Sequence, residues 1–355
     1  MSEFLNPHVS DRGATRVAEV WSQKIDPRVA VGHRHHIVPR FLLARFASQD
    51  GKLRVRQREN GKSSIRSIGD LAVRDFYTSV TIDGTYDSRL ESLFSEVEGA
   101  AARVLSRHLD LRSFARVTSF TPEERAFLDT FVSLQAVRGM RLRRIIEVLA
   151  DFSVKFLNDG ELSDSEIVEI DFLPHPNEHL QSLGRIAERI EANLKPRATS
   201  LIWLDRPLLV IGDEPVVPVH DDQRIQPRSD PRYVVLGEGQ GFANAEMVLL
   251  PITPSVALVY GDIDVVNTAP EYQLAGKDAE VFAVDCNQRI IGRAIEWVAA
   301  HPDNDRFNAM AMPKPQPIVN VSTPDSRAAK QVNTTPARRP KRRLRPEDLS
   351  EVSQR

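Results

Sequence analysis

Pro39 is the residue that most constrains how the first part of this chain can fold. Proline lacks an amide hydrogen and restricts the preceding residue to an extended conformation, so Ile37–Val38 is expected to form a short strand or turn. After it, the spacing of Phe41, Leu42 and Phe46 indicates about two turns of helix with one apolar side. The sequence therefore predicts a rigid corner between an extended segment and a helix.

Three histidines, His33, His35 and His36, stand just before this corner. An imidazole held in a fixed direction can act as a general acid, a general base or a metal ligand near neutral pH. The alternative is that one histidine caps the following helix or satisfies a hydrogen bond in the core, while the other two are solvated. Both interpretations stay open on the sequence alone.

Composition excludes several classes of protein. The chain has 355 residues, of which 41% are hydrophobic, enough for a sizeable core. No run of about 18 apolar residues is present, which predicts no transmembrane helix. The first residues lack the basic start and apolar centre of a secretory signal, so we expect a cytoplasmic protein. The single cysteine, Cys286, excludes an intramolecular disulfide framework and a cysteine-built zinc site.

Charge is distributed unevenly along the chain. From Pro313 to the C-terminus there are ten Lys and Arg against four Asp and Glu, although the whole chain carries a net charge of −2. An acidic body with a basic tail does not favour a general nucleic-acid-coating surface, but it allows a local basic groove. The tail is rich in Pro, Ser and Thr and is predicted to be disordered. It would contact nucleic acid or an acidic partner, or serve only as a soluble tail.

The motif Thr121-Pro122-Glu123-Glu124 is a strong helix start, because it combines an N-cap, a proline in the first turn and a capping box. The helix is predicted to extend to about Leu157. Its apolar stripe places Gln135 and Arg138 on the side that faces the core. An unpaired buried guanidinium is very costly, so Arg138 either pairs with a buried carboxylate or lines a site for an anion such as phosphate.

The order of predicted elements defines the expected fold. A hairpin comes first, a helical middle follows, then strands, and then a last helix. The predicted segments are a hairpin of 53–58 and 64–68, helices at 87–109 and 178–194, a hairpin of 200–204 and 208–211, strands at 246–250 and 256–260, and a helix at 278–300. This predicts an α+β protein with a mainly helical core packed on a small, mostly antiparallel sheet. We expect an arm at 1–32, a single domain at 33–312 and the tail at 313–355.

Further polar residues are candidates for a site. Asp213 follows a predicted buried strand and precedes a proline, where functional carboxylates are often placed, although the composition is also that of an ordinary turn. Asn287 falls in the last predicted helix. Glu91 and Glu98 are seven residues apart and share one side of a helix, which suits metal-binding carboxylates as well as ordinary solvated glutamates.

Arg54, Arg56 and Arg58 alternate along a predicted strand and lie on one face of the first hairpin. Such a stripe could contact phosphates. It is also common for the charged face of a hairpin to be solvated or to protect a sheet edge.

Several of these residues together resemble the DUF4238 family, a bacterial family of proteins of unknown function. The family opens with a His-x-Val-Pro-x-Phe pattern, which His36, Val38, Pro39 and Phe41 meet here with a one-residue slip. Further resemblances occur at Phe76-Tyr77, Asp87…Glu91…Glu98, Gln135…Arg138, Asp213–Val216 and Asn287, and together they cover roughly residues 33–300. The family's Ser-Asp-Asn-Pro reads Gly-Asp-Glu-Pro at 212–215, so the asparagine amide is missing here.

The segment His35–Pro39 also resembles the opening of an HNH endonuclease motif. The resemblance ends after five residues, because an apolar helix follows instead of a glycine-rich turn. The asparagine and final histidine of that motif are also not found at the expected spacing; the next histidine is His108.

Two functions are compatible with these patterns. The first is a phosphoester hydrolase, a nuclease or nucleotide-acting enzyme, with nucleic acid or nucleotide as the partner and no membrane. In this hypothesis, His36 is the acid, base or metal ligand, and Arg138 and Gln135 clamp phosphate. Asp213 orients groups or binds a metal, Asn287 positions the substrate, and His35, His36 and Asp213 hold a divalent metal ion. The alternative is a non-catalytic binding or interaction protein, in which the same polar residues form a buried structural network.

Overall fold

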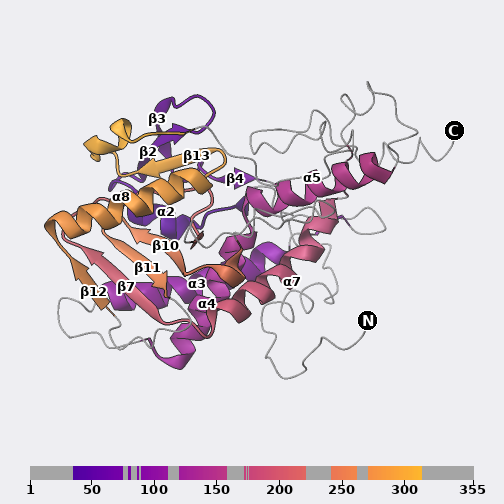
Figure 1. Ribbon diagram of the computed structural model, residues 1–355, viewed down its shortest axis with the longest axis horizontal. Coiled ribbons are helices and arrows are strands. Elements are labelled where there is room, and N and C mark those ends of the chain that lie inside the picture. The colour runs from indigo at the N-terminus through magenta and orange to yellow at the C-terminus, as the bar shows by residue number, and fades with distance from the viewer. Residues whose placement is uncertain are drawn as a thin grey trace.

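The computed structural model describes residues 35–74, 79–80, 86–87, 89–110, 120–157, 172, 174, 176–220, 241–261 and 271–313. The predicted N-terminal arm, the Phe76-Tyr77 pair and the tail from residue 314 lie outside these residues. The described chain folds into helices and mainly antiparallel sheets (Figure 1), which confirms the predicted α+β class. No helix among the described residues is long and apolar enough to cross a membrane.

Two larger sheets form the β part of the molecule. The first has the strand order β12-β7-β11-β10-β9 and is antiparallel except for the parallel pair β12–β7. Its strands are β7 (Thr199–Leu204), β9 (Val217–Val219), β10 (Met247–Thr253), β11 (Val256–Tyr260) and β12 (Glu271–Leu274). The β10–β11 hairpin agrees with the prediction for this stretch.

The second sheet has the order β3-β2-β13-β8 and is antiparallel throughout. It contains the predicted hairpin of β2 (Lys52–Gln57) and β3 (Ser63–Ser67), together with β8 (Ile211–Gly212) and β13 (Trp297–Ala300). Two short pairs complete the strands: β1 (His35–His36) with β4 (Val73–Arg74), and β5 (Ser79–Val80) with β6 (Tyr86–Asp87). The residues between β8 and β9, 213–216, pass from one large sheet to the other.

The helices pack beside and across these sheets. They are α2 (Arg40–Phe46), α3 (Arg89–Asp110), α4 (Pro122–Val137), α5 (Met140–Leu157), α7 (Pro176–Leu194) and α8 (Gly276–Arg293), with short 3-10 turns η3 (Phe242–Asn244) and η4 (Asp305–Ala309). α4 packs between α3 and α7, α2 contacts α3 and β10, and α8 contacts β8 and β9. α5 extends away from the sheets in Figure 1.

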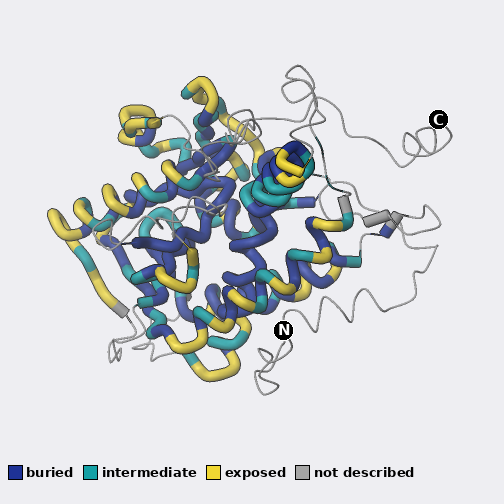
Figure 2. Tube along the Cα trace, turned by 45° about the vertical axis from the view of Figure 1, so that its right-hand side comes forward, coloured by how far each residue is buried: buried dark blue, intermediate teal, exposed yellow. Residues whose placement is uncertain are grey.

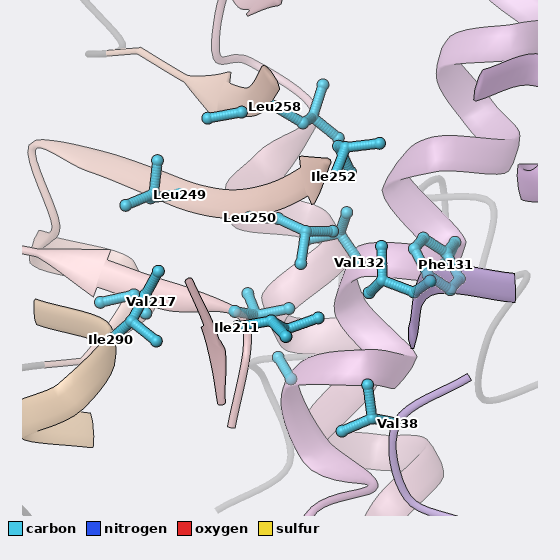
Figure 3. Packing of buried hydrophobic residues seen from close by; sticks show 14 of the residues in the cluster. Val38, Phe131, Val132, Ile211, Val217, Leu249, Leu250, Ile252, Leu258 and Ile290 are labelled. Carbon is cyan, nitrogen blue, oxygen red and sulfur yellow. The ribbon is translucent and has the colours of Figure 1, made fainter. Parts of the chain in front are cut away.

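The apolar core lies where the helices meet the sheets. Figure 3 shows Leu250 and Ile252 of β10 directed toward Val132 and Phe131 of α4. On another side of the cluster, Ile290 of α8 lies near Val217. Figure 2 shows the buried positions gathered inside the molecule and the exposed ones on its outer turns. This packing makes α4 the central helix, and it carries both predicted polar residues, Gln135 and Arg138.

Three predicted boundaries were wrong. The helix that begins at the Thr121 capping box ends at Val137 and restarts at Met140, so it does not continue unbroken to Leu157. The last helix ends at Arg293, and Trp297–Ala300 forms a strand at the centre of the second sheet. Residues 200–204 and 208–211 do not pair, because β7 pairs with β11 and β12 while β8 pairs with β13. In each case long-range strand pairing or packing overrides the local pattern.

Candidate functional site

His36 lies at the corner that the sequence predicts, but the strand precedes the predicted position by two residues. β1 is His35–His36, with His36 opposite Val73, and the Ile37 amide donates to the Ala72 carbonyl at 2.9 Å. Pro39 then precedes the first turn of α2. Because successive strand residues point to opposite faces, His35 and His36 direct their imidazoles to different sides. His35 is buried, whereas His36 is half-buried.

Two side chains of α4 hold the main chain on either side of this corner. Gln135 Nε2 donates to the Ile37 carbonyl at 3.0 Å, and Arg138 Nη2 donates to the His36 carbonyl. Gln135 and Arg138 are one turn apart and almost fully buried. The main chain that carries the His36 side chain is therefore held by hydrogen bonds to the carbonyls of His36 and Ile37. These bonds bring together three of the predicted site residues.

Arg138 also lies against α3. Its Nη1 forms an ion pair with Glu98, and its guanidinium stacks over the Phe94 ring with 4.7 Å to the centroid. The carboxylate pairing that the sequence left open for Arg138 is therefore present, with Glu98 as the partner.

The Glu91 carboxyl lies on the same side of α3, two turns from Glu98. Burial raises the pKa of Glu91. The Arg138 charge partly offsets this rise, and the Glu98 charge adds to it. The Oε2 atom of Glu91 is buried and has no hydrogen-bond partner among the described residues.

The His36 imidazole has an electrostatic environment that favours its neutral form. Burial lowers its pKa and the Arg40 charge lowers it further, while Glu98 and a hydrogen bond with the Ile68 main chain act in the opposite direction. Its Nε2 atom is buried without a hydrogen-bond partner among the described residues. Arg40, at the start of α2, is exposed. His36 is thus an imidazole with a lowered pKa, close enough to the exposed Arg40 to be affected by its charge.

Asp213 lies at the link between the two large sheets and is fully buried. Its carboxylate accepts hydrogen bonds from the amides of Ile295 at 2.9 Å and Glu296 at 2.6 Å, the two residues before β13. Burial raises the pKa of Asp213 to about 7, against hydrogen bonds with main-chain groups, that of Ile295 first, and the Arg141 charge, which lower it. In this position, Asp213 holds the second sheet together through main-chain groups.

Glu214 points the other way, toward the break between α4 and α5. Its Oε1 accepts a hydrogen bond from the Arg141 amide at 2.6 Å, in the first turn of α5. Burial and the neighbouring Asp213 raise the pKa of Glu214 to about 7, opposed by Arg141 and Arg293. Burial and Arg141 in turn lower the pKa of Arg293 to about 9. The two adjacent carboxyls thus join a sheet to a helix start.

Asn287 is buried in α8 and bonds through both ends of its amide. Its Oδ1 accepts from the Val210 amide at 2.9 Å, and its Nδ2 donates to the Leu208 carbonyl at 2.9 Å. Asn287 therefore aligns the segment that leads into β8 and Asp213. No contact between Asn287 and the His36 corner is seen among the described residues.

The structure does not gather the predicted metal ligands. Among the described residues, no three His, Cys, Asp or Glu side chains are grouped closely enough to hold a metal ion, so His35, His36 and Asp213 do not form such a set. Glu98 forms an ion pair with Arg138, and the Arg138 charge also acts on Glu91. His36, Gln135 and Arg138 meet in one place, whereas Asp213 and Asn287 lie around the neighbouring strand β8.

The arginine stripe on the first hairpin is used largely inside the molecule. Arg56 Nη1 donates to the carbonyls of Phe307 at 3.0 Å and Met310 at 2.7 Å, and Arg58 Nε donates to the Ala294 carbonyl at 3.2 Å. Arg56 thus holds the C-terminal segment of the described chain on the second sheet, and Arg58 binds the end of α8.

The sequence did not single out Arg40, Gly139, Arg141 or Arg293. Arg40 and Arg141 carry no periodic signal in the sequence, because what distinguishes them from other arginines is their neighbours in space. Gly139 interrupts the helical pattern directly after Arg138, and a glycine inside such a pattern is a local signal for close packing.

The fold and the site together define an α+β protein in which a buried arginine, Arg138, joins the half-buried His36 to Glu98. The model of the family described as protein of unknown function (DUF4238) matches residues 34–339, most of the chain, and the protein belongs to this family. Neither the curated proteins nor the solved structures gave a significant match.

Proposed function

We propose that this protein is a phosphoester hydrolase, acting on a nucleic acid or a nucleotide, in which His36 is the general base. The observation that carries the proposal is the state of the imidazole. Burial lowers its pKa, which favours the neutral ring, Arg138 and Gln135 hold the main chain that carries it, and its Nε2 has no partner among the described residues. A buried polar atom without a partner is often completed by a water molecule or a substrate group.

In the proposed reaction, Nε2 of His36 takes a proton from a water molecule that attacks phosphorus. The bond between phosphorus and the leaving oxygen breaks, and that oxygen takes up a proton. A neutral imidazole suits the first step, because only the unprotonated ring accepts a proton. Glu91, whose pKa is raised by burial, suits the second as a proton donor near Arg138.

Arg40 supports an anionic substrate. It is exposed, and its charge acts on His36. Arg138, by contrast, directs its Nη1 and Nη2 to Glu98 and the His36 carbonyl. We therefore assign the phosphate contact to Arg40 and the positioning of His36 to Arg138.

A second candidate is the non-catalytic interaction protein. One observation favours it: Gln135, Arg138, Asp213 and Asn287 all bond main-chain groups, as residues of a structural network do. In this function, the corner is a rigid part of a binding surface and His36 performs no proton transfer.

A cleavage assay separates the two. Wild type, His36→Gln and the control His301→Gln would be incubated with single- and double-stranded DNA, RNA and nucleotides, with magnesium, manganese, zinc or chelator. The hydrolase proposal expects cleavage by wild type and the control, with a loss of at least about 100-fold in His36→Gln, the usual contribution of a general base. Equal cleavage by all three would reject His36 as the base, and no cleavage by folded wild type on any substrate would favour the interaction protein.

A further inference from the structure

A second side chain, Glu214, lies at the break between α4 and α5, next to the residue that binds the His36 main chain. α4 ends with Arg138 as its C-cap, where the Arg138 amide still donates to the Leu134 carbonyl at 3.0 Å. α5 begins at Met140, and its first-turn Arg141 amide donates to Glu214. Only Gly139 separates the residue that holds His36 from the start of α5.

Glu214 also packs directly on Gly139. A Cβ atom at position 139 would lie 2.7 Å from both the Cδ and Oε2 atoms of Glu214, closer than real Cβ contacts allow. The three nearest atoms to that Cβ all belong to Glu214. The close approach of this carboxyl therefore requires a glycine at 139, and the carboxyl defines where the chain turns from one helix to the next.

The Glu214 carboxyl is itself held in place by its surroundings. Glu214 is 2% exposed, and its neighbour Asp213 is fixed by the amides of Ile295 and Glu296. Arg141, whose amide it binds, is anchored at the other end by a hydrogen bond from Nη2 to the Arg293 carbonyl at 2.8 Å. The α4–α5 break is thus connected to the second sheet through Glu214 and its neighbour Asp213, and to the end of α8 through Arg141.

We infer that Glu214 is a positioning residue for the proposed active site: it fixes the α4–α5 break and, through Arg138, the direction of His36. The inference rests on the proposed function for its catalytic meaning, but its structural content does not depend on activity. It predicts that a change at Glu214 or Gly139 reaches His36, although neither residue contacts the imidazole in the described structure.

The test reads the imidazole itself. The His36 ring resonances of full-length, ¹⁵N-histidine-labelled protein would be recorded at pH 8 for wild type, Glu214→Ala, Glu214→Gln, Gly139→Ala and the double variant Gly139→Ala/Glu214→Ala. Glu280→Ala, an exposed carboxylate on α8, is the control. We expect clear shifts of the His36 signals in Glu214→Ala and Gly139→Ala, and wild-type positions in Glu214→Gln, which retains an acceptor for the Arg141 amide, and in the control.

The double variant makes the test independent of folding failures. Removing the Glu214 side chain vacates the space that a methyl group at 139 needs, so the two changes should be strongly non-additive. If Gly139→Ala does not fold, the Glu214→Ala background should restore folding. Unshifted His36 signals in folded Glu214→Ala and Gly139→Ala, or additive effects in the double variant, would overturn the inference.

The same variants separate this inference from the hydrolase proposal. Shifted His36 signals without any cleavage by wild type would retain the positioning role and reject the hydrolase. Cleavage by wild type that is unchanged in folded Glu214→Ala, with unshifted signals, would reject the positioning role alone.

Discussion

Arg138 and His36 are joined through the guanidinium of one and the main-chain carbonyl of the other, so that a buried cation on the central helix fixes the backbone beside the candidate base. The same guanidinium pairs with Glu98 on α3. One residue therefore links three elements, and the consequences of removing it can be measured.

Arg138→Ala should destabilise the fold substantially. Its removal leaves the Glu98 carboxylate and the His36 carbonyl without their partner, and breaking a buried ion pair in this way costs about 3 kcal/mol or more. Urea unfolding measures the loss. The control is Arg289→Ala, which breaks a more exposed pair with Asp285 and should cost less than about 1 kcal/mol. Equal stabilities of the two variants would contradict the structural role of Arg138.

Asn287→Ala should act on stability before it acts on activity. The variant leaves the Val210 amide and the Leu208 carbonyl unsatisfied inside the protein, at a cost of about 2 kcal/mol. Gln288→Ala, an exposed amide on the same helix, should change the free energy of unfolding by less than about 0.5 kcal/mol. A fully stable Asn287→Ala that has lost activity would point to direct substrate contact instead.

Arg138 and Asn287 show how much of the candidate site can be predicted from the sequence. The helical stripe identified Gln135 and Arg138 as buried polar groups that need partners, because periodicity reports which side of a helix faces the core. It could not identify the partners, since Glu98 and the His36 carbonyl are distant in the sequence. Asn287 was placed in a helix by local pattern alone, and its role depends on the segment that leads into β8, about eighty residues earlier in the chain.

The wrong boundaries have the same origin. The apolar residues of Trp297–Ala300 continue the pattern of the preceding helix, but antiparallel pairing with β2 and β8 makes this segment a strand. At the break after Arg138, Glu214 packs on Gly139 from another part of the chain. Local propensity cannot anticipate contacts of this kind.

The Asp213–Glu214 pair should give the fold a measurable pH dependence. Burial raises the pKa of both carboxyls to about 7, while in the unfolded chain they titrate near 4. Between these values the native state binds more protons than the unfolded state, so this pair makes the free energy of unfolding fall as pH rises from about 4 to about 7. Glu214→Gln removes one titration, so its stability should fall less than that of wild type over this window. Urea unfolding at pH 4.5 to 7.5 tests this, and parallel curves would contradict it.

Arg40→Ala should change both substrate binding and the base. Arg40 is exposed, so its removal should leave stability within about 0.5 kcal/mol. Because the Arg40 charge lowers the pKa of His36, that pKa should rise in the variant, as an NMR titration of the ring would show. KM for a phosphodiester should rise, and its dependence on salt should weaken. If the pKa of His36 is the same in Arg40→Ala as in wild type, Arg40 is not part of the site.

The most direct test of the central claim is the pH dependence of phosphodiester cleavage. If the neutral His36 imidazole takes the proton, kcat/KM of wild type should rise with pH through a pKa below the ordinary value of about 6.5 and then level off. Residual cleavage by His36→Gln should lack this acid limb. A rate independent of pH between 4.5 and 7.5, or the same acid limb in His36→Gln, would show that His36 is not the base.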